Sequence, residues 1–245
     1  MNFIRKIVKP YTKEEAAFYS ELKKLVQFSP KDLSQYKKAF THRSLKLVDP
    51  KGLPFNYERL EFLGDAMLDA VIGSYLYKKA PQGDEGYLTQ MRSKIVSREH
   101  LNELGKDLNL IKYLHSNIAK KNIGDNIHGN IFEALIGAIY LDRGYNYCKK
   151  FVYSKVIVPY VDIAKLEGKI TSYKGLLIEW CQKKKKTYAF ESYEDSGNET
   201  VKHFSVKASI SGKLVGKGRA TSKKKAEEQA AKRAYYALQN HITTS

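Results

Sequence analysis

The periodicity of apolar residues changes once along this 245-residue chain, and the change divides the chain into two parts. From Lys13 to about Tyr160 the pattern predicts helices, with little alternation of apolar and polar residues. After residue 172 a helix precedes three short segments with strand alternation, and a last helix follows at 222–238. We therefore predict a multi-domain chain, with an all-helical domain at 1–168 and a small α-β-β-β-α domain at 172–241.

Lys and Arg exceed Asp and Glu by 17, which indicates a polyanionic partner, nucleic acid before an anionic membrane surface. The chain has no run of 18 apolar residues, and residues 3–9 are too short and too charged for a signal-peptide core. We therefore expect a soluble cytoplasmic protein with no membrane partner. Cys148 and Cys181 match no metal-ligand spacing and are interpreted as reduced packing residues.

The segment at 56–71, NYERLEFLGDAMLDAV, places three acids on one side of an expected helix, at Glu58, Glu61 and Asp65. Apolar residues flank them on that same side, at Phe62, Leu68 and Ile72. A helix that is apolar nearly all round is a buried one, and buried carboxylates are costly unless they are paired or bind a cation. A solvated acidic edge, or pairing with Arg59, is the alternative to a shared ligand.

A second acidic helix is expected at 128–142, HGNIFEALIGAIYLD. Asn130 and Glu133 share one face of it, and Gly137, one turn further on, leaves room for another helix to approach closely. Two such helices can face each other across a cluster of oxygen ligands. Oxygen ligands without His or Cys spacing favour Mg²⁺ or Mn²⁺ over Zn²⁺. Such a site polarises a phosphoryl oxygen and generates hydroxide from water near neutral pH.

The C-terminal part, 171–245, carries +8 of the net charge. The lysine run at 183–186 alone is typical of a solvated face. Lys223, Lys224 and Lys225, however, occupy the first turn of the last helix, where positive charge opposes the helix dipole. Because helix N-termini bind anions, these lysines indicate a phosphate partner. The module is interpreted as a nucleic-acid binder.

Several motifs together resemble the ribonuclease III family. YERLEFLGDAMLDAVIGSYLY is similar to the family's signature helix, and further motifs follow in the family's order and spacing: FTHRS (40–44), DEGYLTQMRSKIVS (84–97) and HGNIFEALIGAIYLDRG (128–144). The C-terminal YKGLLIEW and GKGRATSKKKAEEQAA resemble the double-stranded-RNA-binding domain of bacterial members. The resemblance covers residues from about 20 to 240.

The resemblance implies roles for individual residues. Glu61 and Glu133 match metal-coordinating glutamates, and Asp65 and Glu133 match the pair assigned as catalytic, with Asp65 close to the metal. Glu58 matches an acid linked to structure or substrate contacts, and Glu85 matches a further acidic position of lesser standing. In the second domain, the resemblance implies RNA contacts at Lys174, Glu179, Gln182, Thr200, Lys223, Lys224 and Lys225.

Two positions depart from the family pattern. Asn130 stands where most members have an Asp metal ligand; its amide oxygen can coordinate, but without charge, so we expect weaker affinity for divalent metal and a greater preference for Mn²⁺. Thr200, in the sequence GNET, stands where members commonly have the His of a Gly-Pro-x-His loop that contacts the minor groove.

The activity that the resemblance implies is cleavage of double-stranded RNA by a homodimeric endoribonuclease. Mg²⁺ is the expected cofactor, Mn²⁺ is expected to substitute, and no small-molecule cofactor is expected. Each active site would cut one strand, leaving 5′-phosphates, 3′-hydroxyls and two-nucleotide 3′ overhangs. Ribosomal RNA precursors and other structured transcripts are the family expectation, although no residue here selects them.

Two other interpretations of the chain stay open. One is a non-catalytic RNA-binding protein that keeps the fold, which is disfavoured because only one ligand position is altered. The other is a DNA-directed enzyme with the same metal chemistry, which is disfavoured by the C-terminal module. Among single residues, His42 is interpreted as a capping or packing residue, His128 as structural and Asp69 as a surface acid.

Overall fold

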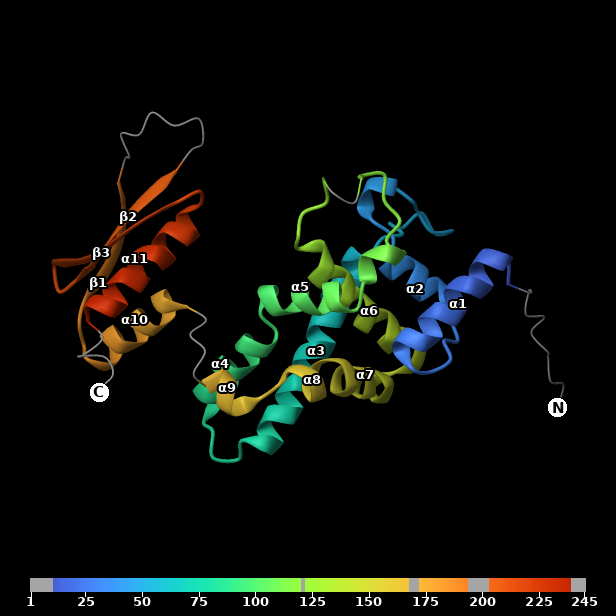
Figure 1. The fold of residues 1–245 in the computed structure, drawn as a ribbon, viewed down its shortest axis with the longest axis horizontal. Coiled ribbons are helices and arrows are strands. Elements are labelled where there is room, and N and C mark those ends of the chain that lie inside the picture. The colour runs from blue at the N-terminus through green and yellow to red at the C-terminus, as the bar shows by residue number, and fades with distance from the viewer. Residues whose placement is uncertain (1–10, 120–121, 168–171, 194–202, 239–245) are drawn as a thin grey trace. The chain divides into compact units, whose positions relative to one another are not determined.

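A computed structural model describes residues 11–119, 122–167, 172–193 and 203–238 of the chain (Figure 1). Its contacts divide the chain into two compact units, residues 1–168 and 169–245, each with its own hydrophobic core. We call them the N-terminal unit and the C-terminal unit. The domain boundaries expected at 168 and 172 lie at or beside this division.

The N-terminal unit is helical, as the sequence predicts. Its two longest helices, α3 (Glu58–Lys79) and α6 (Ile127–Arg143), pack against each other. The other α-helices are α1 (Lys13–Val26), α2 (Leu33–Ala39), α4 (Glu85–Ile95), α5 (Arg98–Asp107), α7 (Tyr145–Val152), α8 (Val158–Tyr160) and α9 (Ile163–Glu167). Shorter turns are η1 (Arg43–Leu45), η2 (Leu110–Tyr113) and the π-helical η4 (Tyr153–Ile157).

Side-chain caps fix where several of these helices begin. Thr12 and Glu15 form a reciprocal capping box at the start of α1. At the start of α4 the carboxylate of Asp84 accepts the backbone N–H of Tyr87, and Ser97 caps α5 in the same way. Each cap satisfies a backbone donor that the first helical turn leaves without an internal partner.

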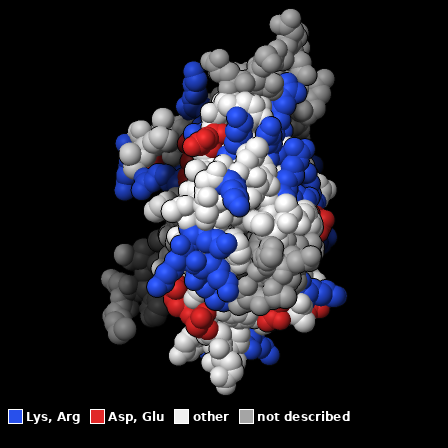
Figure 2. All heavy atoms as spheres, turned by 90° about the vertical axis from the view of Figure 1, so that its left-hand side faces the viewer, with Lys and Arg blue, Asp and Glu red and all other residues white. Residues whose placement is uncertain are grey.

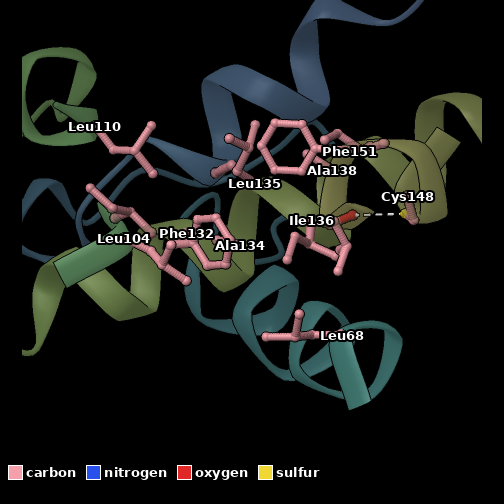
Figure 3. Packing of buried hydrophobic residues seen from close by; sticks show 14 of the residues in the cluster. Leu68, Leu104, Leu110, Phe132, Ala134, Leu135, Ile136, Ala138, Cys148 and Phe151 are labelled. Carbon is pink, nitrogen blue, oxygen red and sulfur yellow. Dashed lines mark hydrogen bonds between the residues drawn. The ribbon is translucent and has the colours of Figure 1, made fainter. Parts of the chain in front are cut away.

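Helix α6 is the centre of the N-terminal core. Every residue from 131 to 139 is buried, including Glu133. Figure 3 shows side chains of α6 packed among residues of neighbouring elements, such as Leu68, Leu104 and Phe151. The Sγ atom of Cys148 lies 3.4 Å from the carbonyl oxygen of Ile136. Both cysteines of the chain are free and buried, which confirms their interpretation as packing residues.

The backbones of α3 and α6 approach closely because glycines lie at their contact. A Cβ atom at Gly137 of α6 would lie 2.3 Å from the carbonyl oxygen of Leu60 on α3. No real Cβ tolerates such a contact with a backbone atom, so the position requires glycine. The close approach predicted for Gly137 is confirmed. It fixes α3 and α6 against each other at the level of their acidic residues.

The burial of α3 differs from the sequence prediction. Leu68 and Ile72 are buried as expected, but Phe62 is 81% exposed, and Leu63 and Met67 are only half-buried. The prediction that this helix is buried nearly all round was therefore wrong for one side of it. The face of α3 that bears Phe62 is exposed in the single chain. No other described element of the N-terminal unit covers the Phe62 ring.

The C-terminal unit has the predicted α-β-β-β-α order. Its elements are α10 (Tyr173–Lys183), β1 (Tyr188–Tyr193), β2 (Phe204–Ile210), β3 (Lys213–Ala220) and α11 (Lys223–Ala237). The strands form an antiparallel sheet in the order β1-β2-β3. Helix α11 packs closely on β3, where a Cβ at Gly218 would lie 2.0 Å from the carbonyl oxygen of Ala226. No described helix of either unit is long and apolar enough to cross a membrane.

Candidate functional site

Three carboxylates gather where α3 and α6 pack together. Glu61 and Asp65 lie one turn apart on α3, and Glu133 lies on α6 at the point where its backbone meets Gly64. Glu133 is only 6% exposed, Glu61 is half-buried and Asp65 is exposed. The predicted helix pair is present. Its three acids differ in exposure, from the buried Glu133 to the exposed Asp65.

Burial and mutual repulsion disfavour negative charge at this site. Burial, and then the nearby charge of Asp65, raises the pKa of Glu133 to about 7 from an ordinary value of 4.5. Burial is also the main cause of a raised pKa at Glu61, and the charges of Glu58 and Asp65 add to it. Acids that resist ionisation in this way would be stabilised in their charged form by a cation.

None of the three carboxylates makes a hydrogen bond or ion pair with a protein group in the part of the chain that the structure describes. Within that part, no three His, Cys, Asp or Glu side chains converge closely enough to form a ready-made metal cage. The predicted cluster of oxygen ligands is thus positioned by its helices but not closed by its side chains. A cation would have to draw the side chains of Glu61, Asp65 and Glu133 inward.

Asn130, the fourth predicted ligand, lies one turn before Glu133 and is engaged by an arginine. Its Oδ1 atom accepts a hydrogen bond of 2.7 Å from Nη1 of Arg98. Arg98 is the first residue of α5, directly after the capping Ser97. Its positive charge opposes the raised pKa values of Glu61 and Glu133. Arg98 is not among the site residues predicted from the sequence, although it is a basic residue at a helix start, like the lysines of α11 that were predicted from that position.

The two lesser acids have other contacts. Glu58 is exposed and forms an ion pair of 3.1 Å with Arg43. Glu85 is exposed, and its Oε1 accepts a hydrogen bond of 3.0 Å from Thr89 in its own helix. No hydrogen bond or ion pair within the described ranges joins either residue to the three carboxylates of α3 and α6, although the charge of Glu58 helps to raise the pKa of Glu61.

Structural roles were also predicted for His42 and His128, and a surface position for Asp69. His42 is buried and caps η1, with Nδ1 accepting the backbone N–H of Ser44 at 3.1 Å, so the capping interpretation is confirmed. Asp69 is half-buried, burial raises its pKa, and it forms an ion pair of 3.8 Å with Arg92. Its side chain is 38% exposed, as expected of a surface acid, but its Oδ1 atom is buried without a hydrogen-bond partner in the described residues. His128 lies in the first turn of α6, and burial lowers its pKa.

The C-terminal unit exposes most of its predicted RNA-binding residues. Lys223, Lys224 and Lys225 are exposed in the first turn of α11, and Ser222 caps this helix. Figure 2 shows a face on which the blue Lys and Arg surface is more extensive than the red Asp and Glu surface. The three lysines thus lie in the first helical turn, as predicted from the sequence, and their contact with phosphate stays a prediction.

The predicted contacts on α10 differ among themselves. Glu179 and Gln182 are exposed. Lys174 is half-buried, and its Nζ forms an ion pair of 2.6 Å with Glu227 of α11. Its charge is therefore already engaged inside the unit. Thr200 lies outside the described residues.

A helical unit with carboxylates at a helix crossing, joined to a basic α+β unit, defines a two-domain protein that acts on nucleic acid. Family models agree: a Ribonuclease-III-like model matches residues 32–160, and a double-stranded RNA binding motif matches residues 173–238. This chain belongs to the ribonuclease III family.

Similar proteins extend over the whole chain. It is 64% identical to Ribonuclease 3 of Zunongwangia profunda, over 99% of this chain and 100% of that protein. It is 60% identical to Ribonuclease 3 of Flavobacterium psychrophilum, over 99% of each chain. A solved nuclease domain of ribonuclease III from Campylobacter jejuni is 30% identical, with a TM-score of 0.51, over 57% of this chain and 96% of that one. That nuclease domain is described as structurally flexible in a region involved in dimer formation.

Proposed function

We propose that the chain is an endoribonuclease that hydrolyses double-stranded RNA at the carboxylates of Glu61, Asp65 and Glu133. The observation that carries the proposal is the buried carboxylate of Glu133, which lies beside two further acids and has no protein partner in the described residues. A buried acid without a partner reduces the free energy of unfolding, so its presence here indicates a functional role.

The residues present fit a divalent cation. The donors of Glu61, Asp65 and Glu133 are carboxylate oxygens, and such oxygens suit Mg²⁺ or Mn²⁺. Cation binding requires ionised carboxylates, so it would release the proton that Glu133 holds near neutral pH. When bound, the cation supplies a Lewis acid for the phosphate and lowers the pKa of water for attack.

The protein's own residues contribute position. Glu133 is held by the close packing of α6 against α3, so its carboxylate loses little further freedom when it acts. Asp65 is exposed and can approach the RNA backbone, while Glu61 lies one turn before it on the same helix. We assign Asp65 and Glu133 as catalytic residues, and Glu61, Asp65 and Glu133 as the metal-binding set. Asn130, the fourth ligand implied by the resemblance, is left out of this set because its Oδ1 accepts the hydrogen bond of Arg98.

The C-terminal unit supplies affinity for the duplex. Lys223, Lys224 and Lys225 place three exposed charges at the start of α11, where backbone N–H groups also favour phosphate. Double-stranded RNA is recognised mainly by its A-form shape and its backbone, so this unit can bind many sequences. Both cysteines are free, which is typical of a reducing cytoplasm, where we place the protein.

We also propose that two copies pair through the open side of α3. Phe62 is 81% exposed beside an open hollow of about 850 Å³. The hollow is lined in part by four leucines, Leu53, Leu60, Leu63 and Leu141. A two-fold interface lets each Phe62 fill the partner's hollow, because such interfaces are self-complementary. Two sites in one dimer would cut both strands and leave two-nucleotide 3′ overhangs.

Cleavage of labelled duplex RNA tests the proposal. The wild-type chain should cut RNA with Mg²⁺, cut no duplex DNA, and stop when a chelator is added. Glu133→Gln keeps the side-chain shape but removes a metal-binding charge, so it should abolish cleavage and leave RNA binding nearly intact. Glu14→Gln, at an exposed acid of α1, should cleave normally. Cleavage by Glu133→Gln at saturating Mg²⁺ would overturn the proposed site.

A further inference from the structure

Arg98 places a positive charge beside the acidic cluster without being neutralised there. Its Nη1 atom donates to Asn130 Oδ1 at 2.7 Å, yet no Asp or Glu oxygen in the described residues lies within 4.0 Å of its guanidinium nitrogens. Its side chain is exposed. Arg98 therefore differs from Arg43 and Arg92, which form ion pairs with acids of α3.

The partner of Arg98 explains why its charge stays available. An amide accepts a hydrogen bond and orients the guanidinium but leaves its net charge at +1. A carboxylate at the same position would pair with the guanidinium and neutralise it. The amide of Asn130, at a position where the resemblance implies an Asp, thus orients Arg98 and leaves its charge unneutralised.

The location of Arg98 also favours an anionic ligand. It is the first residue of α5, a helix of 10 residues, where a cation opposes the helix dipole and helix N–H groups favour negative charge. A guanidinium has five N–H donors, and Asn130 occupies only one position on it. The remaining donors can form a two-point contact with phosphate oxygens, an arrangement for which arginine is well suited.

We propose that Arg98 binds the scissile phosphate of the RNA and that Asn130 is the residue that positions it. The inference rests on the proposed function. During hydrolysis the water loses a proton as its oxygen bonds to phosphorus, the bond from phosphorus to the 3′ oxygen breaks, and that oxygen takes up a proton, so the numbers of protons lost and gained are equal. Arg98 stays protonated throughout, and its donors stabilise the charge that grows on the phosphoryl oxygens.

Arg98→Ala and Arg98→Gln test the proposal in single-turnover cleavage at saturating RNA and Mg²⁺. Loss of one preorganised donor group of this kind slows reactions by about 10²-fold or more. Both variants should show such a loss, and Arg98→Lys should recover part of the rate because it restores the charge without the planar fork. Lys78→Ala, which removes an exposed charge near the other end of α3, should cleave at the wild-type rate.

Calorimetric titration of the RNA-free proteins with Mg²⁺ separates this role from a role in the metal site. Arg98→Ala should bind Mg²⁺ at least as tightly as the wild type, because a neighbouring cation is gone, whereas Glu133→Gln should bind it more weakly. Wild-type cleavage rates in both Arg98 variants would overturn the proposal, and so would lost Mg²⁺ binding in them. If Arg98→Ala does not fold, Arg98→Gln decides. The proposed function would fail differently, through cleavage by Glu133→Gln.

Discussion

A Cβ atom added to Gly64 of α3 would lie 1.7 Å from the backbone carbonyl oxygen of Glu133 on α6. The two helices therefore touch backbone to backbone at the residue whose side chain we assign to catalysis. Gly64 directly precedes Asp65, so this one contact sets where the acids of both helices lie. The same contact between α3 and α6 therefore contributes to the packing of the core and fixes the positions of the acids of the site.

Gly64→Ala should consequently destabilise the fold and the site together. The added methyl group meets backbone that cannot rotate away, and such overpacking costs about 3 kcal/mol or more. Gly73→Ala on the same helix is the control, since its Cβ would lie 4.0 Å from the nearest atom, in the Arg92 side chain. It should stabilise by up to about 1 kcal/mol. Urea unfolding followed by circular dichroism measures both, and equal midpoints would contradict the packing argument.

The sequence predicts the helices and the close approach well, because both depend on local patterns. Apolar periodicity marks α3 and α6, and the glycine at 137 falls on the face of Asn130 and Glu133. The last helix and its lysine-rich first turn follow from the same kind of signal. Each of these features depends only on residues that are close in sequence along a single helix.

Contacts between residues that lie far apart in the sequence could not be predicted from local sequence patterns. Arg98 is 32 residues from Asn130 in the sequence, and Lys174 is 53 residues from Glu227. No local sequence pattern therefore predicts either contact. The exposure of Phe62 is a similar case, because periodicity shows that a face is apolar without showing what covers it. Ligand positions could thus be assigned by resemblance, while the arginine beside them could not.

The stability of the metal-free protein should fall as pH rises through neutrality. Glu133 has a pKa of about 7 when folded and an ordinary value of 4.5. A raised pKa means that the folded chain binds the proton more tightly. The resulting stability is complete below about pH 4.5 and lost as pH rises through 7, a change of about 3 kcal/mol.

Urea unfolding in chelator at a series of pH values, for wild type and Glu133→Gln, isolates this contribution. The free energy of unfolding of the wild type should decline relative to the variant across that window. Mg²⁺ should reverse the decline at high pH, because a ligand that binds only the folded state stabilises it. Parallel curves for the two proteins would mean that Glu133 does not titrate as its burial requires.

Phe62→Asp should convert the proposed dimer to monomers. Each buried phenyl ring contributes about 1.5–3 kcal/mol and a two-fold dimer has two, so the dissociation constant should rise about 100-fold or more. Tyr77→Asp is a matched control, because Tyr77 is 73% exposed on the same helix but does not line the hollow. Sedimentation velocity distinguishes the two variants. Unchanged association of Phe62→Asp would place any dimer interface elsewhere.

Deletion of residues 172–245 should weaken RNA binding without removing the chemistry. All proposed ligands lie in the N-terminal unit, which has its own core. Cleavage should persist at low salt, where the remaining charge of +9 still attracts RNA, and should fall steeply as salt rises. Assays across a salt series with Mg²⁺ check this. A folded deletion variant without activity at any salt concentration would refute the assignment of the site to this unit.

Asn130→Asp tests whether Asn130 and Arg98 act together. With Arg98 in place, the new carboxylate should pair with the guanidinium 2.7 Å away and neutralise it. Single-turnover cleavage at saturating Mg²⁺ should then fall about tenfold, the factor that corresponds to about 1.4 kcal/mol of lost transition-state stabilisation. The Mg²⁺ concentration for half-maximal cleavage should change little, because the added charge is already paired.

The same substitution in an Arg98→Ala background should behave differently. The carboxylate is then unpaired beside Glu133, so it can join the metal-binding set, and the Mg²⁺ midpoint should fall below that of Arg98→Ala alone. Titrations of cleavage with Mg²⁺ for the four proteins of this cycle, at equal folded concentration, measure the coupling between the two positions. If Asn130 instead binds the metal directly in the wild type, Asn130→Asp lowers the midpoint whether or not Arg98 is present. That outcome would assign Asn130 to the metal and leave Arg98 without its positioning residue.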